Sequence, residues 1–196
     1  MDERAKHHKK STKHKISKKR QKDNQAAGLK ELWVDGCFFD LEGRAGGGAV
    51  LCSHEGKIEA TMSFELNHLG ITQSEQAELW TAVYALKALR PETVGRIISD
   101  NPIVVSSMEK IRGGKALKAG MDERLKTHLA EAVLAQPHMV IERITDGKNR
   151  PRGQGKTPLA DGFAKAAARA DETALDKAIR RAGNFPHKHT ASPTAG

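Results

Sequence analysis

Residues 57–66 alternate strictly between apolar and polar side chains, and this pattern constrains the fold more than any other feature of the chain. The apolar positions are Ile58, Ala60, Met62, Phe64 and Leu66. Side chains of a β-strand point alternately to opposite faces of a sheet, so this period predicts a strand with one buried face. Residues 31–40 and 48–52 predict two earlier strands, connected by a turn that contains Gly43 and the glycine triplet 46–48. Together the three strands predict an antiparallel meander.

After the meander the apolar residues recur at spacings of three and four, which is typical of helices. A helix is expected over residues 74–89, closed by Pro91, and the last helix is expected to begin with Thr157 as N-cap and Pro158 as its first residue. Between them we expect a strand at 96–100, a helix after Pro102, a helix at 122–134 and a strand at 138–145. The last helix is expected to continue or restart through Leu175 and Ile179. This order predicts an α/β fold, with a mixed five-stranded sheet and flanking helices.

Charge and composition divide the 196 residues into three parts. Residues 1–28 hold ten Lys or Arg and three acids, a net +7 of the total +9, and carry almost no large apolar side chain. They predict a disordered basic arm, because they cannot bury enough surface to offset the entropy of ordering. Residues 29–183 predict one catalytic domain, whose charge is close to neutral. Residues 184–196 predict a flexible C-terminal tail.

Several classes of protein are excluded by what the sequence lacks. No stretch approaches the roughly 18 apolar residues of a membrane span, and no apolar segment of a secretory signal follows the N-terminus. Cys37 and Cys52 fall in two different predicted strands without metal-ligand spacing, which favours reduced, buried thiols. We therefore expect an intracellular protein without a membrane partner, cytoplasmic or, in a eukaryote, nuclear.

Four acidic residues occupy positions from which they can converge. Asp35 lies in the first strand and Asp100 ends the strand that follows the first helix. If these strands are parallel neighbours, as right-handed crossovers favour, their carboxylates meet at one edge of the sheet. Glu78 lies one residue before the apolar stripe of its helix, and Asp161 lies in the first turn of the last helix. Each acid alone could be a turn or capping residue, but four together would repel strongly without cations, and oxygen ligands favour Mg²⁺ or Mn²⁺.

The sequence resembles the type 1 ribonuclease H family over residues 32–171. The resemblance is carried, in order, by WVDGCF, the glycine triplet, SEQAELWTAVYALKAL, IISDN and LADGFAKAAARA. It implies a ribonuclease H-like fold and a metal-dependent endonuclease that cuts the RNA strand of RNA–DNA hybrids. It further implies two Mg²⁺ or Mn²⁺ ions per site, with Asp35 bridging both, Glu78 and Asp100 holding the first, and Asp161 holding the second. Contacts to 2′-hydroxyl groups in the minor groove would distinguish RNA from DNA.

The motifs that contact substrate in this family are partly changed here. Cys37 stands where members often have Ser, Ser74-Glu75 replaces an Asn pair, and Asn101-Pro102 replaces Ser-Gln. Glu75 is expected to point outward or to pair with a base, since another carboxylate would weaken phosphate binding. The basic handle of many members is reduced to Lys110, Arg112, Lys115 and Lys118. Candidate substrate-binding residues are Gly36, Cys37, Ser74, Asn101, Lys148 and Arg150.

The loop at residues 146–156 has no His, although the family commonly places a mobile His there. We expect Lys148 and Arg150 to act electrostatically on phosphate, and the metals to carry the chemistry. His187 and His189 in the C-terminal tail are the other candidates for a proton shuttle.

The expected partners are an RNA–DNA hybrid and, through the basic arm, nucleic acid in general, with the protein itself a monomer. The arm could instead serve as a localisation signal or a solubilising tail. Two other functions stay open: a catalytically weak or inactive ribonuclease H-fold binding module, and a related metal nuclease acting on another structured nucleic acid. Retention of all four acids disfavours a pure binder, since a cluster of negative charge does not help to hold a polyanion.

Overall fold

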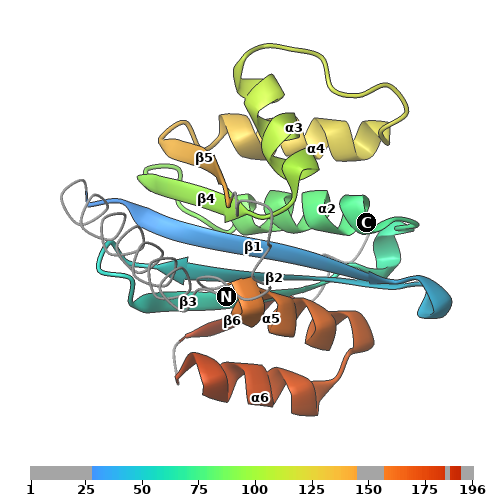
Figure 1. Ribbon diagram of the computed structural model, residues 1–196, viewed down its shortest axis with the longest axis vertical. Coiled ribbons are helices and arrows are strands. Elements are labelled where there is room, and N and C mark those ends of the chain that lie inside the picture. Colours follow the sequence, from blue (N-terminus) through green and yellow to red (C-terminus); the bar gives the residue numbers. More distant parts are fainter. Residues whose placement is uncertain (1–27, 145–156, 184–185, 191–196) are drawn as a thin grey trace, which may run out of the picture.

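The computed structural model describes residues 28–144, 157–183 and 186–190, which form a six-stranded mixed sheet in the order β5-β4-β1-β2-β3-β6 (Figure 1). The strands are β1 (Lys30–Phe39), β2 (Arg44–Cys52), β3 (Ile58–Glu65), β4 (Gly95–Ser99), β5 (Met139–Arg143) and β6 (His187–Thr190). The first three form the predicted antiparallel meander, β4 lies parallel to β1, and β5 lies parallel to β4. The predicted α/β class is confirmed.

Five α-helices of the described residues cover the two faces of this sheet (Figure 1). They are α2 (Ser74–Lys87), α3 (Pro102–Arg112), α4 (Glu123–Leu134), α5 (Thr157–Arg169) and α6 (Glu172–Ala182). Helices α2, α3 and α4 lie on one face, and α5 and α6 lie on the other. Two short 3₁₀ helices, η1 (Asp40–Glu42) and η2 (Asn67–Leu69), follow β1 and β3. No helix of the described residues is both long enough and apolar enough to cross a membrane.

Polar side chains fix where three helices begin. The Asn101 side chain accepts a hydrogen bond from the Ile103 N–H at 2.8 Å at the start of α3, and Asp122 does the same for α4. Asp171 caps α6, which restarts the helical path after Ala170 adopts a left-handed φ of 49°. Such caps satisfy N–H groups that have no partner within the helix. The last predicted helix is therefore two helices, as one of the sequence alternatives expected.

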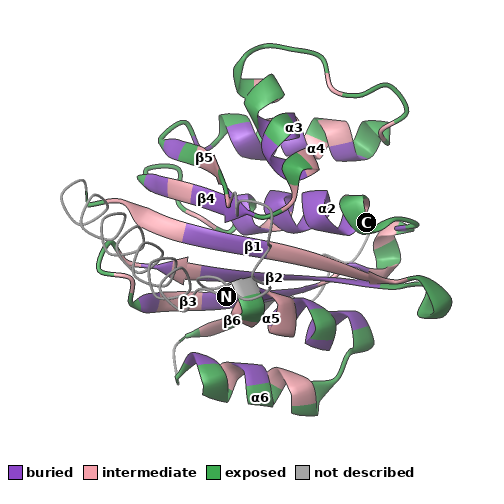
Figure 2. Ribbon diagram, viewed as in Figure 1, coloured by how far each residue is buried: buried purple, intermediate pink, exposed green. Residues whose placement is uncertain are grey.

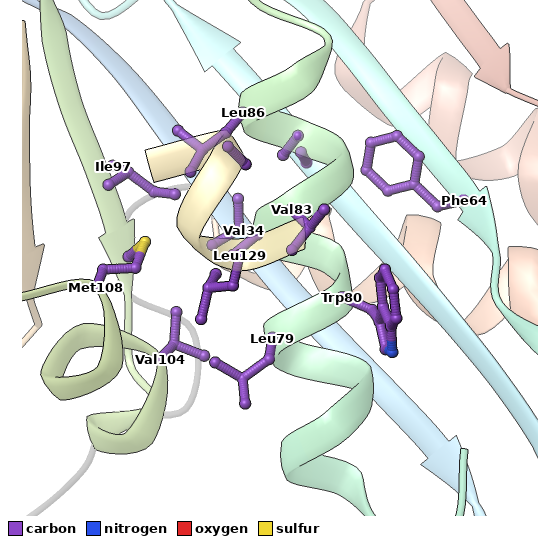
Figure 3. Packing of buried hydrophobic residues seen from close by; sticks show 14 of the residues in the cluster. Val34, Phe64, Leu79, Trp80, Val83, Leu86, Ile97, Val104, Met108 and Leu129 are labelled. Carbon is purple, nitrogen blue, oxygen red and sulfur yellow. The ribbon is translucent and has the colours of Figure 1, made fainter. Parts of the chain in front are cut away.

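The core is divided by the sheet into two hydrophobic clusters. The larger one, seen in Figure 3, contains Leu79, Val83 and Leu86 of α2, Val34 of β1 and Leu129 of α4. The smaller cluster on the opposite face contains Trp33, Val50, Ile98 and Phe163 among its members. Figure 2 shows the buried residues concentrated in the central strands and on the helix sides that face them. Successive side chains of β1 therefore point to opposite faces of the sheet, with Val34 in the larger cluster and Trp33 in the smaller one.

Two predictions about the meander are corrected by the structure. β2 begins at Arg44, so the glycines at positions 46–48 lie inside the strand, and the turn is η1 followed by Gly43 at a φ of +61°. β3 was expected to bury one face, but residues on both of its faces are buried. The polar positions Thr61 and Ser63 are covered because α5 and β6 pack on that side.

A third correction concerns the C-terminal end, where residues 184–196 were expected to form a flexible tail. Residues His187–Thr190 instead form β6, parallel to β3, so the sheet has one strand more than expected. His187 contacts the hydroxyls of Thr61 and Ser63 at 3.0 and 3.2 Å, and its ring stacks on Phe163. Helix α6 returns the chain to the edge of β3, where β6 can pair. The four polar residues of β6 have no pattern from which this strand could be predicted. The basic arm at residues 1–28 lies almost entirely outside the described residues.

Candidate active site

Glycines in β1 and β2 let two helices approach the sheet closely. A Cβ atom on Gly36 would lie 2.5 Å from the backbone N of Glu78 in α2. On β2, a Cβ at Gly48 would lie 2.0 Å from the Ala160 carbonyl oxygen, and one at Gly46 would lie 2.2 Å from the Ala164 carbonyl oxygen. Real Cβ atoms do not approach a backbone so closely, so only glycine permits this packing. As a result, Glu78 on α2 and Asp161 on α5 are both brought close to β1.

Three carboxylates from three elements form one group. Asp35 lies within β1, Glu78 lies in the first turns of α2, and Asp100 directly follows β4. One oxygen from each of these side chains lies within 4.8 Å of the other two. β1 and β4 are parallel neighbours whose pairing ends at Trp33 and Ile98, and Asp35 and Asp100 each lie two residues further on, which confirms the expected convergence of their carboxylates. Glu78 is buried, Asp35 is half-buried and Asp100 is exposed, so the group opens to solvent on the Asp100 side.

The electrostatics of this group are unfavourable without a cation. Burial, and then the charges of Asp100 and Asp161, raise the pKa of Asp35 from 3.8 to about 7. Burial and the neighbouring Asp35 and Asp100 hold the pKa of Glu78 well above its usual value. Two hydrogen bonds oppose this effect on Glu78, from the Gly36 N–H at 3.1 Å and from the Asn101 side chain. The protein therefore orients a carboxylate that its own surroundings make costly to ionise.

The donor set fits a hard divalent cation. Three carboxylates offer only oxygen ligands, which suit Mg²⁺ or Mn²⁺, and a bound cation would relieve the repulsion that raises the pKa of Asp35. Asp35, Glu78 and Asp100 are the residues that could hold it. No sulfur or imidazole ligand belongs to this group of described residues.

The fourth predicted acid, Asp161, lies near this group but is not part of it. Its Oδ2 atom accepts a hydrogen bond from Lys165 Nζ at 2.8 Å, one helical turn further along α5. Asp161 nevertheless contributes to the raised pKa of Asp35, so it lies within electrostatic range of β1. Sequence reasoning did not include Lys165 in the site. The spacing of four residues between Asp161 and Lys165 was the available signal, because such pairs share one face of a helix.

The predicted substrate-binding residues have different surroundings. Both sides of the Asn101 amide have protein partners, since its oxygen caps α3 and its N–H group donates to Glu78. The Gly36 N–H also donates a hydrogen bond to the Glu78 carboxylate. Ser74 is exposed at the start of α2. Burial raises the pKa of the half-buried Cys37 thiol to about 12. Contact of these four residues with substrate stays a prediction.

Other basic and acidic candidates are placed as follows. Lys148 and Arg150, with the whole loop at residues 146–156, lie outside the described residues. Glu75 is exposed on α2, as expected. In the predicted basic handle, Arg112 donates to the Gln136 carbonyl at 2.8 Å and so helps to hold α3 against the end of α4. Lys110, Lys115 and Lys118 are exposed.

No protein-family model and no curated protein matches the chain. Among solved structures it is similar to a ribonuclease H1 from the archaeon Halobacterium salinarum, with 21% identity over 73% of this chain and 99% of that one, and a TM-score of 0.55. The N-terminal ribonuclease H domain of a Mycobacterium tuberculosis protein is 22% identical over 77% of this chain and 99% of that one, with a TM-score of 0.52. A foamy viral protease–reverse transcriptase in complex with an RNA/DNA hybrid is 17% identical over 73% of this chain and 20% of that one, with a TM-score of 0.55. The chain therefore has a ribonuclease H-like fold, as its sequence predicted.

Proposed function

We propose that the protein is a divalent-cation-dependent endonuclease that hydrolyses the RNA strand of RNA–DNA hybrids. The observation that carries this proposal is the group of Asp35, Glu78 and Asp100, whose oxygens lie within 4.8 Å of one another just beyond the last paired residues of β1 and β4. Solved structures with the same fold include a ribonuclease H1, and a foamy viral protease–reverse transcriptase that matches over 20% of its chain is in complex with an RNA/DNA hybrid. Fold alone does not determine activity, so the acids provide the chemical part of the argument.

The three carboxylates would hold the cation, Mg²⁺ or Mn²⁺, and Asp161 would complete the binding of a second ion. Such ions supply an activated water and stabilise the charge that develops on the leaving oxygen. The Gly36 N–H and the Asn101 amide fix the orientation of Glu78. Asp100 is exposed and gives the scissile phosphate access to the site, while the buried Glu78 holds its ligand atom away from competing solvent.

Specificity for a hybrid would come from groups beside the acids. Gly36 and Cys37 of β1, Ser74 at the start of α2 and Asn101 before α3 would face the minor groove and its 2′-hydroxyl groups. Lys148 and Arg150 would contact phosphate, and the +7 charge of residues 1–28 would add affinity that depends on salt. The nearly neutral remainder of the chain implies that the catalytic domain alone binds hybrid weakly.

The test compares labelled RNA–DNA hybrid, duplex RNA, duplex DNA and a DNA four-way junction, each with Mg²⁺, Mn²⁺ or a chelator. We expect cleavage of the RNA strand of the hybrid alone, only with a divalent cation. Asp100→Asn should reduce the rate by at least about 100-fold, because it removes a charged ligand that contributes little to packing. Asp176→Asn, a change of the same kind on the exposed surface of α6, serves as the control.

Each alternative function predicts a different result. Cleavage of the junction but not of the hybrid would identify a nuclease with another substrate. Hybrid binding without cleavage in either metal would identify a binding module. Cleavage by Asp100→Asn at the wild-type rate would show that the carboxylate group is not the active site.

A further inference from the structure

Asp161 and Lys165 lie along one flank of α5, next to β1. Ala160 and Ala164, the residues that precede them, place their carbonyl groups against Gly48 and Gly46 of β2. Asp35 and Cys37 are the β1 partners of these two glycines, and the pKa of each responds to both Asp161 and Lys165. This flank of α5 therefore borders β1, the strand that carries Asp35 and that α5 contacts.

The Asp161–Lys165 ion pair has the geometry of a contact that another cation can replace. The Nζ and Oδ2 atoms are 2.8 Å apart, but 52% of the Lys165 side chain and 38% of the Asp161 side chain are exposed. Exposed pairs spaced by four residues on a helix contribute little to stability. A divalent cation carries twice the charge of an ammonium group and reaches Asp161 through water, so it can compete for the same carboxylate.

We propose that Lys165 is a positioning residue that keeps Asp161 out of the metal group and thereby sets the affinity of the site for its second cation. This inference rests on the proposed metal-dependent function. In the metal-free protein the ammonium group acts as an internal counter-ion for the acids on β1 and α5. Binding of the second cation requires Asp161 to exchange Lys165 for the metal, and the displaced positive charge stays nearby on the same helix.

The first cation is affected less, because its three ligands are already assembled without Asp161. Lys165 is one turn away from Asp161 along α5 and does not contact Asp35, Glu78 or Asp100 through any hydrogen bond or ion pair found among the described residues. Removal of the lysine charge should therefore change the affinities for the two cations by different amounts. The second cation should gain the most affinity, while the first, which Lys165 reaches only through its charge near Asp35, should gain less.

The experiment measures Mn²⁺ binding by calorimetry to the full-length protein without nucleic acid, so that the result does not depend on turnover. For wild type we expect a stronger and a weaker site. Lys165→Met should raise the affinity of the weaker site by about tenfold, since a single charge near a divalent ion at intermediate dielectric has an effect of this order. Lys165→Arg, which keeps the positive charge, should bind at the weaker site with the wild-type affinity. Asp161→Asn should remove the weaker site.

Lys126→Met is the control, because Lys126 also pairs with an acid of its own helix, Glu123 at 2.6 Å on α4, but on the opposite face of the sheet. Circular dichroism checks folding, and Lys165→Gln repeats the test if the Met variant aggregates. The inference would be overturned if the affinity of the weaker site stayed the same or fell in both Lys165→Met and Lys165→Gln. It would also be overturned if Lys165→Arg raised that affinity as much as Lys165→Met. Failure of the wild type to bind Mn²⁺ at all would instead overturn the proposed function and this inference with it.

Discussion

Replacement of Asp35 by Asn should make the metal-free protein more stable while it abolishes hybrid cleavage. Asp35 is half-buried and ordinarily titrates at 3.8, but burial together with Asp100 and Asp161 raises its pKa to about 7. At about 1.4 kcal/mol per pH unit, the difference corresponds to roughly 4 kcal/mol of unfavourable free energy in the folded protein above pH 7. Residual exposure to water screens these interactions, so we expect Asp35→Asn to recover about 2 kcal/mol.

The sign of the pH dependence follows from which state binds the proton more tightly. The folded pKa lies above the unfolded one, so the folded protein holds more protons between about pH 4 and pH 7. Stability of the wild type should fall as the pH rises through this window and should be lowest above it. The advantage of Asp35→Asn should therefore be largest at about pH 8 and nearly absent at about pH 4.

Urea and thermal unfolding in the presence of a chelator measure this effect, with Asp176→Asn as the control. For a chain of this size, about 2 kcal/mol corresponds to a Tm increase of about 4–8 °C. Addition of Mg²⁺ should stabilise the wild type and reduce the difference, because the variant has lost a ligand. If Asp35→Asn were no more stable than wild type at pH 8 without divalent cations, the account of repulsion among these acids would be refuted.

Three further predictions concern packing, the thiol and the arm. Gly48→Ala should lower the free energy of unfolding, measured in urea, by about 3 kcal/mol, because its Cβ would overlap the Ala160 carbonyl. Gly162→Ala, whose Cβ meets no atom closer than 4.0 Å, should raise it by about 0.5–1 kcal/mol. A loss of stability well below about 3 kcal/mol in Gly48→Ala would contradict the close packing of α5. Alkylation of Cys37 at pH 8 should be at least about tenfold slower in the folded protein than in urea, since burial raises the pKa of its thiol to about 12, and equal rates would refute its burial. Removal of residues 1–28 should flatten the dependence of log K for hybrid on log salt, and an unchanged slope would leave the arm without a binding role.

The sequence by itself determined the order of the elements and the identity of the acids. Alternation in residues 57–66 and the three-to-four spacing in 74–89 are local properties, because each follows from the direction in which successive side chains point. The meander, the parallel pairing of β4 with β1 and the convergence of Asp35 with Asp100 followed from these elements and from the handedness of crossovers. The structure confirms these predictions, because local patterns together with general rules of strand connection were enough to make them.

The tertiary structure decided what depends on contacts between segments far apart in the chain. The glycines at positions 46–48 were expected in a turn, a usual place for glycine, and only the approach of α5 to β2 shows that they make room for a helix backbone. β6 has no hydrophobic period of its own and exists because α6 delivers it to the open edge of β3. Likewise, all four acids were identified in the sequence, and the spacing of four residues allowed Asp161 to pair with Lys165. Only the position of α5 on the sheet decides that Asp161 lies outside the group of Asp35, Glu78 and Asp100.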